Sequence, residues 1–279
     1  MLRSHPLPMP RLLTVCADDF GLTRAVCDGI MDLVRARRVT AVSCMTNAPG
    51  WEHGAGALRQ LPASACAGLH INLTEGHPLS RELARQWPRL PGLPALLALT
   101  HLGRTPQTAL QAEIEAQWTR FVLDTGEAPR FVDGHQHVHQ FPGVRDALFA
   151  ALDRLGARPA IRSTAALIGP GHGFKRWIVR HTGARQLQAS LQQRGLPHNA
   201  ALLGAYDFDS RRYRHRMRAW LAALPDSGGL LYCHPGHAPA ADATDAIGRA
   251  RQHEFDYLAS DDFTHDLMAA DVVLQGCRA

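Results

Sequence analysis

The chain has 279 residues, 46% of them hydrophobic and 20% charged, which is enough to bury the core of one large α/β domain or two small ones. No stretch approaches the roughly 20 apolar residues of a membrane-spanning helix, so the sequence predicts no transmembrane segment. The net charge of +5 is compatible with an anionic partner but is too mild to indicate a nucleic-acid-binding protein.

The cysteines of the sequence bear on its cellular compartment, and its histidines bear on metal binding and proton transfer. Six cysteines are scattered without a Cys-x-x-Cys pair, and four fall in or beside apolar runs: Cys16, Cys44, Cys66 and Cys233. We therefore expect reduced thiols and a cytoplasmic protein. Several of the 16 histidines fall in short motifs, and imidazole is both a common metal ligand and a proton carrier. Residues 1–10 predict a flexible leader without the apolar run of a signal peptide.

The first predicted element is a buried strand at residues 12–17, which Asp18 and Asp19 end. Gly21 then predicts a turn, and apolar residues at helical spacing from Val26 to Val34 predict an amphipathic helix. In parallel α/β proteins the carboxyl ends of the strands carry the site, so both carboxylates would lie at its edge. The alternative for such a pair is an N-cap aspartate beside an exposed neighbour.

The rest of the chain alternates strands with helices. Further strands are predicted at residues 39–45, 67–74, 131–133, 160–163, 229–233 and 271–274, and helices at 51–61, 110–122, 144–155, 211–224 and 249–259. The alternation predicts a parallel α/β layer or barrel with right-handed crossovers, formed by residues 11–279 as a single domain.

Two segments depart from this alternation. Residues 75–107 contain five prolines and an apolar patch, which predicts an irregular insertion that forms a lid or a wall over a site. Residues 174–194 are basic and partly aromatic. They predict a solvated helix that covers the barrel, with a peripheral membrane contact as the alternative.

Side chains that bind metals or carry protons end four of the predicted strands. They are Asp18 and Asp19, His70, Asp133 with His135, His137 and His139, and His234 with His237. A single histidine on an apolar strand is usually a core residue, and His-Pro-Gly is also a plain turn. The ends of parallel strands share one rim, however, so we expect these groups to converge. If the backbone of the histidine triplet is extended, its period-two spacing would point all three imidazoles to one side, although only some of them need be metal ligands.

One carboxylate with two imidazoles suits Zn²⁺, Mn²⁺, Co²⁺ or Fe²⁺, and suits Mg²⁺ less well. Such a metal lowers the pKa of water and polarises a carbonyl, which is hydrolytic chemistry. A second carboxylate could then act as the general base, and a histidine from a distant strand could protonate a leaving amine. His234 is the candidate for that acid.

Three motifs resemble those of a known family. They are Ala-Asp-Asp-Phe-Gly-Leu at residues 17–22, Gly-Leu-His-Ile-Asn-Leu-Thr at 68–74 and Asp-Gly-His-Gln-His-Val-His-Gln-Phe-Pro at 133–142. In this order they resemble the YdjC-like carbohydrate deacetylases, which include the chitooligosaccharide deacetylases and the hopanoid-biosynthesis deacetylase group. The later His234-Pro235-Gly236 and the pair Arg251 and Glu254 are also similar.

The resemblance implies a TIM-like, irregular (β/α) barrel that removes the N-acetyl group from an amino sugar. It implies one divalent metal ion, either Mg²⁺ or Zn²⁺, with other transition metals also suited to the ligands. Asp18 would be the catalytic base. The implied metal ligands are Asp19, His70 and His135, and the residues expected to contact substrate are Arg162, Thr74 and His137.

The sequence departs from the chitooligosaccharide-type pattern at Gln136, where those members can have another histidine, so the sugar is less defined than the reaction. An N-acetylated oligosaccharide or a lipid-linked glycan is the expected substrate, and a homodimer is left open. The alternative functions are a metal-dependent phosphoesterase or glycosidase on the same barrel, and a non-catalytic carbohydrate-binding barrel.

Overall fold

The computed structural model describes residues 10–170, 179–238 and 245–276, so nearly all of the expected leader lies outside the described residues. Within these ranges, eight strands form one sheet. They are β1 (Arg11–Phe20), β2 (Ala41–Cys44), β3 (Cys66–Ile71), β4 (Phe131–Gly134), β5 (Ala160–Ile161), β6 (Leu202–Leu203), β7 (Gly229–Cys233) and β8 (Val272–Leu274). The predicted strands are thus present, several of them shorter than expected.

The sheet has the strand order β5-β4-β3-β2-β1-β7-β6, with β8 also paired to β1, and every pairing is parallel. Its two outer edges meet where Ile161 of β5 forms a bridge with His198, four residues before β6. The Ile161 amide donates to the Pro197 carbonyl oxygen at 2.8 Å. A second bridge joins Leu167 to Leu202 of β6, and the curled parallel sheet with its helices confirms the expected irregular α/β barrel fold.

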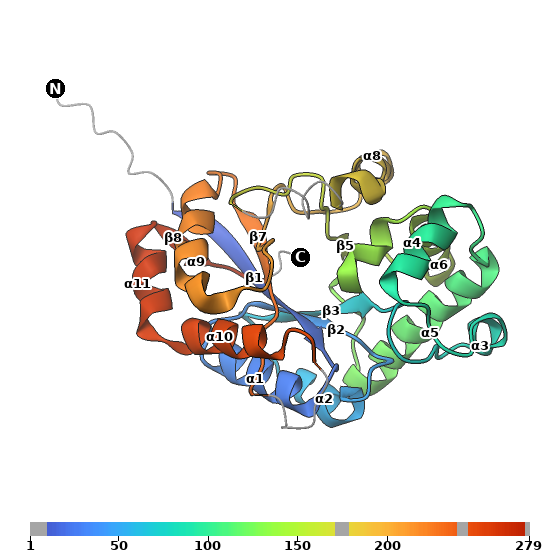
Figure 1. Ribbon diagram of the computed structural model, residues 1–279, viewed down its shortest axis with the longest axis horizontal. Helices are drawn as coiled ribbons and strands as arrows, with labels where there is room; N and C mark the ends of the chain where they lie inside the picture. Colours follow the sequence, from blue (N-terminus) through green and yellow to red (C-terminus); the bar gives the residue numbers. More distant parts are fainter. Residues whose placement is uncertain (1–9, 171–178, 239–244, 277–279) are drawn as a thin grey trace.

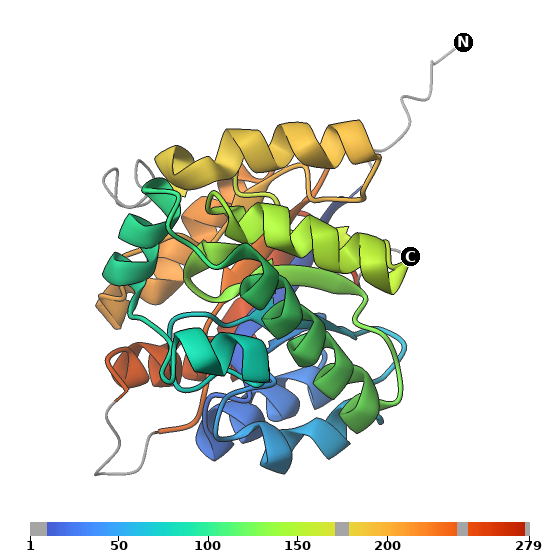
Figure 2. The same cartoon turned by 90° about the vertical axis from the view of Figure 1, so that its right-hand side faces the viewer.

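Helices pack around the outside of the curved sheet (Figures 1 and 2). The α-helices are α1 (Arg24–Arg35), α2 (Trp51–Leu58), α3 (Arg81–Gln86), α4 (Leu93–His101), α5 (Gln107–Thr125), α6 (Val144–Leu155), α8 (Arg185–Arg194), α9 (Tyr213–Ala223), α10 (Gly248–Ala259) and α11 (Asp261–Ala269). Short turns of other helix types are η1 (His135–Gln140), η2 (Arg180–Ala184) and η3 (Ser210–Arg212). No helix among the described residues is long and apolar enough to cross a membrane.

Helix α1, which follows β1, has an N-cap residue and an apolar face, as its sequence predicts. The Thr23 side chain accepts a hydrogen bond from the Val26 amide at 3.2 Å and so caps the N-terminus of α1. The apolar face of α1, which includes Ile30 and Leu33, is buried against the sheet. The same core contains apolar residues of β1, β7 and α9 to α11.

A second core lies between β3, β4, α5 and α6, and the proline-rich insertion joins it. Residues 75–107 are less irregular than expected because they contain α3 and α4. Ser80 caps α3, and Pro94 stands in the first turn of α4, where a missing amide hydrogen costs nothing. Leu83 and Leu96 bury their side chains in the second core.

The cysteines follow the sequence expectation with one exception. Cys16, Cys27, Cys44 and Cys233 are free and buried. Cys66, at the start of β3, is in a disulfide, so the expectation of a reduced thiol was wrong for this residue.

Candidate active site

A bulge in β1 brings both aspartates of the Asp18-Asp19 pair to the site. Ala17 pairs with Val42 and Phe20 pairs with Cys44, so two residues of β1 stand opposite Ser43 alone. Asp19 has a φ of 67°, an unusual conformation for a residue other than glycine. In a regular strand these neighbours would point to opposite faces, but the extra residue re-aims one side chain.

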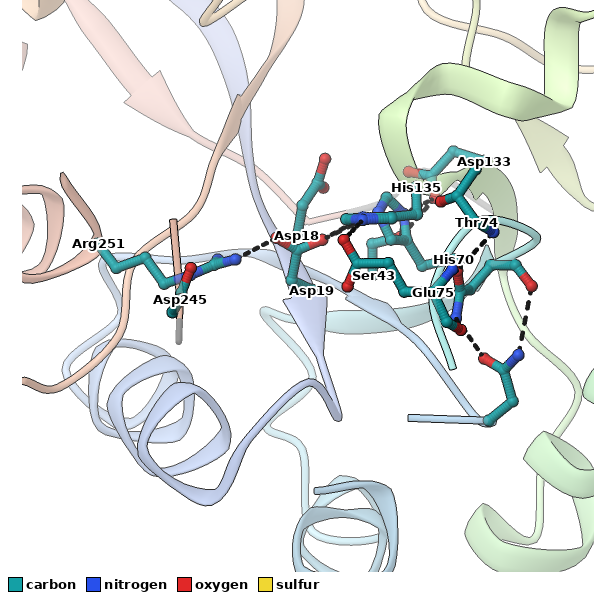
Figure 3. Close-up of polar contacts among 12 residues, drawn as sticks. Asp18, Asp19, Ser43, His70, Thr74, Glu75, Asp133, His135, Asp245 and Arg251 are labelled. Carbon is teal, nitrogen blue, oxygen red and sulfur yellow. Dashed lines mark hydrogen bonds and ion pairs between the residues drawn. The ribbon is translucent and has the colours of Figure 1, made fainter. Parts of the chain in front are cut away.

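Asp19, His70 and His135 form the centre of the site (Figure 3). Asp19 Oδ1 lies 2.8 Å from Nδ1 of His135 and 3.3 Å from Nε2 of His70. All three side chains are buried, and one ligand atom from each lies within 4.8 Å of the others. A carboxylate oxygen and two imidazole nitrogens at this spacing fit a divalent transition metal ion and leave positions for water and substrate.

His70 is oriented from behind by Asp133 and Ser43. Its Nδ1 lies 2.6 Å from Asp133 Oδ1, and the Ser43 hydroxyl donates to the same carboxylate oxygen at 2.5 Å. Burial lowers the pKa of His70, but the Asp133 carboxylate outweighs it and raises that pKa to about 10. With Nδ1 engaged, Nε2 faces Asp19, which is the arrangement in which carboxylates orient metal-binding histidines.

The second oxygen of Asp19 is held by Arg251. Nη2 of Arg251 lies 2.8 Å from Asp19 Oδ2, and Nε of the same guanidinium lies 2.7 Å from Asp245 Oδ2 (Figure 3). Burial acts to raise the pKa of Asp19, but Arg251 and His135 hold it well below its ordinary value. Asp19 is therefore a charged carboxylate with one oxygen directed at the histidines.

Asp18 has different surroundings. Arg162 binds both of its carboxylate oxygens at 2.6 Å and reaches Asp133 Oδ2 at 2.5 Å and Cys16 Sγ at 3.2 Å. Burial raises the pKa of Asp18 in spite of this guanidinium. Cys16, Asp18 and Asp133 also have metal-ligand spacing, but the Arg162 guanidinium already supplies the cation between them.

The histidine triplet does not have an extended backbone. β4 ends at Gly134 and the chain turns into η1, with φ values of 55° at Gln136 and 60° at His137. These left-handed residues rotate successive side chains apart, so the prediction of three imidazoles on one side was wrong. His135 alone joins Asp19, whereas His139 Nε2 lies 2.9 Å from the Arg162 carbonyl oxygen.

His137 and His234 both contact the ring of Tyr232. The ring centroid of Tyr232 is 5.2 Å from that of His137 and 5.6 Å from that of His234, and both contacts are edge-on. The His234 amide donates to Glu254 Oε2 at 2.6 Å. His237, which was expected at the same rim, instead lies 2.9 Å from Asp32 on α1.

A model of the YdjC-like protein family matches residues 12–269. The chain belongs to the YdjC-like family. The family membership expected from the sequence motifs is thereby confirmed, and the match spans the strands that carry the site.

Several relatives of this YdjC-like protein have assigned names. The "Carbohydrate deacetylase" of Mus musculus is 32% identical over 252 residues, which cover 83% of this chain and 80% of that protein. The "Carbohydrate deacetylase" of Danio rerio is 32% identical over 196 residues, and the chain spans 60% of its length. The "Chitooligosaccharide deacetylase" of Proteus mirabilis is 34% identical over 176 residues, 57% of this chain and 66% of that protein.

A solved structure shares the fold of this YdjC-like chain. The crystal structure of an Enterococcus faecalis V583 protein, described as a presumed cellobiose-phosphate cleavage protein, has a TM-score of 0.73 with 17% sequence identity. The likeness covers 96% of this chain and 97% of that one, and it supports the single α/β architecture.

Sequence reasoning missed several side chains of the YdjC-like site. Glu75 Oε1 lies 3.1 Å from His135 Nε2, while Ser43, Tyr232 and Asp245 have the contacts described above. Asp133, which the sequence analysis named together with the histidine triplet, lies near the end of β4 and pairs in register with His70 of β3. Thr74 is buried, and its hydroxyl has no hydrogen-bond partner among the described residues.

Proposed function

We propose that this YdjC-like protein is a metal-dependent carbohydrate deacetylase that hydrolyses the N-acetyl group of an amino sugar and releases acetate. The observation that carries the proposal is the contrast between two adjacent carboxylates. Asp19 faces two imidazoles, whereas both carboxylate oxygens of Asp18 are bound by Arg162. A site that only bound a sugar would have no use for a second, separately oriented buried carboxylate. The names of the relatives support the same reaction.

In this proposal Asp19, His70 and His135 hold one divalent ion, Zn²⁺ or Mg²⁺. When bound, that ion supplies Lewis-acid chemistry to a carbonyl oxygen and to water. Asp18 accepts a proton from the water that attacks the acetyl carbon. The burial that raises the pKa of Asp18 makes it a stronger base for this step.

The leaving nitrogen needs a proton when its bond to the acetyl carbon breaks, and we assign that proton to His234. The oxygen of the water remains in the acetate; one of its protons goes to Asp18 and the other is released when the acetic acid ionises, while the sugar amine takes up the proton from His234. Arg162 orients Asp18 through its two hydrogen bonds, and contacts of Arg162, Thr74 and His137 with the sugar stay predictions.

The substrate class in this proposal is an N-acetylated oligosaccharide or lipid-linked glycan, and the compartment is the cytoplasm. We further propose that residues 75–107 form a wall of the substrate site. Glu75, the first residue of that segment, contacts His135, which supports this placement.

The test is an acetate-release screen of the metal-loaded protein over soluble and lipid-linked N-acetylhexosamines. We expect acetate from at least one of these substrates, and none after the metal is removed with a chelator. Release of phosphate or of a free sugar without acetate would contradict the proposal.

The division between the two aspartates can be tested directly. Asp18→Asn is expected to abolish acetate release, because an amide cannot accept the proton from water, while zinc binding stays close to that of the wild type. Asp19→Asn is expected to lose both activity and zinc. Zinc content is measured by equilibrium dialysis, and full activity in Asp18→Asn would refute the assignment.

A further inference from the structure

Two buried residues of α10, Arg251 and Glu254, contact different halves of the site. They are three residues apart and therefore lie on one face of the helix. Arg251 is 3% exposed and Glu254 is fully buried. Each makes its own set of contacts, so one helix reaches both Asp19 and the loop that carries His234.

Arg251 divides the two oxygens of Asp19 between different partners. Its guanidinium binds Oδ2 and is itself fixed by Asp245, while Oδ1 is left to His70 and His135. A carboxylate held in this way presents one oxygen, in one orientation, to a cation. Residues that orient a metal ligand from behind commonly change metal affinity 10- to 100-fold when they are removed.

Glu254 is hydrogen-bonded to the loop that carries His234. Its carboxylate accepts hydrogen bonds from the His234 amide at 2.6 Å and from the Tyr213 hydroxyl at 3.3 Å, and also from the Tyr206 hydroxyl. The Gly236 amide donates to the Arg251 carbonyl oxygen at 3.2 Å, so the loop is tied to the same turn of α10. The position of the His234 backbone therefore depends on Glu254.

These contacts are poorly explained as devices for stability alone. Taking a guanidinium and carboxylates out of water costs several kcal/mol for each ion, and apolar residues of similar size are often as stabilising. In our interpretation the network instead gives a defined orientation to two residues, Asp19 in β1 and His234 directly after β7.

We propose that Arg251 and Glu254 are positioning residues, with Arg251 setting the metal-facing oxygen of Asp19 and Glu254 setting the proton-donating imidazole of His234. The inference rests on the proposed function. It adds two separable roles on one helix, and each role has a readout that does not require acetate release.

The Arg251 role is tested with zinc alone. Arg251→Met retains most of the apolar stem but removes the hydrogen-bonding fork, so we expect zinc affinity to fall about 10- to 100-fold in competition with a chromophoric chelator. Arg251→Lys restores the charge and is expected to recover part of the affinity. Unchanged zinc affinity in Arg251→Met would overturn this half of the proposal.

The Glu254 role is tested by separating kcat from KM. Glu254→Ala is expected to lower kcat about 100-fold, because a misplaced acid loses its alignment, with KM and zinc affinity within about twofold of the wild type. Glu254→Gln keeps an acceptor oxygen for the His234 amide and is expected to recover most of kcat. The matched control is Asp256→Asn, on the exposed side of α10.

A purely structural role of α10 predicts a different result. Zinc affinity and kcat would then fall together in both Arg251→Met and Glu254→Ala, and that outcome would overturn the proposal. If the wild type releases no acetate, spectra of ¹³C-histidine-labelled protein still decide the Glu254 role. The His234 signal, identified by its absence in His234→Asn, should then move in Glu254→Ala and stay in place in Arg251→Met. A wild type that binds no zinc would refute the proposed metal site itself.

Discussion

The two aspartates at the end of β1 are neighbours in sequence with opposite electrostatic surroundings. Arg251 and His135 outweigh burial at Asp19 and lower its pKa, whereas burial outweighs Arg162 at Asp18 and raises its pKa. One carboxylate is thereby kept charged and the other is made more basic. Pairs of titratable groups whose surroundings separate their pKa values in this way are typical of acid–base sites.

Asp133 should matter to the proposed metal site although it is not a proposed ligand. The Asp133 carboxylate orients His70 and raises the pKa of its imidazole. Asp133→Asn removes that charge. We expect zinc affinity to fall about 10- to 100-fold in a chelator competition assay. Asp226→Asn, an exposed aspartate, serves as the control, and equal affinities in the two variants would contradict the role of Asp133.

Glu254 should make the stability of the protein depend on pH. Burial raises its pKa from an ordinary 4.5 to about 7. The folded protein therefore binds this proton more tightly than the unfolded chain, so the resulting stability is complete below about pH 4.5 and is lost as the pH rises to about 7.

The expected loss is of the order of 3 kcal/mol in the free energy of unfolding. Urea unfolding at pH 5 and pH 7.5 measures it, with Glu254→Gln as the comparison because glutamine does not titrate. A wild type and a Glu254→Gln variant that lose equal stability between the two pH values would show that Glu254 does not titrate in this range.

The sequence could indicate individual site residues but not their partners. Asp18, Asp19, His70 and His135 were predicted because they lie at the ends of apolar strands and match family motifs; the structure brings the last three together and pairs Asp18 with Arg162. The contacts of Arg162 with Asp18 and Asp133 depend on which strands are neighbours in the barrel. That information is not contained in the local pattern of any one strand.

Among the elements, the turn after β4 shows the limit of periodicity. Alternating histidines in the sequence are compatible with a strand, but η1 has left-handed residues at Gln136 and His137. Neither glutamine nor histidine by itself predicts a left-handed backbone, so the spacing of the histidines could not predict this turn. The strand before this turn and the helix after it were predicted close to their observed positions.

The loop after β7 lies between α1 and α10. The loop can approach α1 closely because Gly29 of α1 has no Cβ. A Cβ at Gly29 would lie 2.7 Å from the His237 amide nitrogen and 3.0 Å from Gly236. Gly29→Ala is therefore expected to displace the loop that carries His234 and to lower kcat for acetate release by about tenfold or more.

The control is Gly56→Ala in α2, where a Cβ would meet no atom within 4 Å. Both substitutions remove a glycine from a helix and gain a similar helix propensity of up to about 1 kcal/mol. A difference in kcat between them therefore reports the loop contact. Equal kcat values would argue against the close packing of α1 on this loop.

For the molecule as a whole, the alternation of strands and helices was sufficient to predict a parallel α/β barrel. The manner of closure was not predictable. β5 and β6 contain two residues each, and the two edges of the sheet are joined by two isolated bridges among the described residues, Ile161 to His198 and Leu167 to Leu202. Such short pairings have no sequence pattern of their own, because their residues are held by contacts from neighbouring elements.

A metal ion at the proposed site should stabilise the whole barrel. Its ligands come from β1, from β3 and from the turn after β4, so the bound ion would link three parts of the sheet. Zinc at about 100 times its dissociation constant contributes about 2.7 kcal/mol, which corresponds to a rise in Tm of roughly 5–10 °C. Differential scanning calorimetry measures this shift, and Asp19→Asn should show little of it.

The bulge in β1 makes the site sensitive to the length of the strand as well as to its composition. Asp18 and Asp19 both face inward only because two residues share the space opposite Ser43. Deleting either aspartate would remove the extra residue and restore the regular two-residue alternation, so that a single carboxylate would stand opposite Ser43. A substitution can therefore remove one proposed role at a time, whereas the loss of a single codon would remove one carboxylate and also the bulge that brings the proposed base and the proposed metal ligand to the same site.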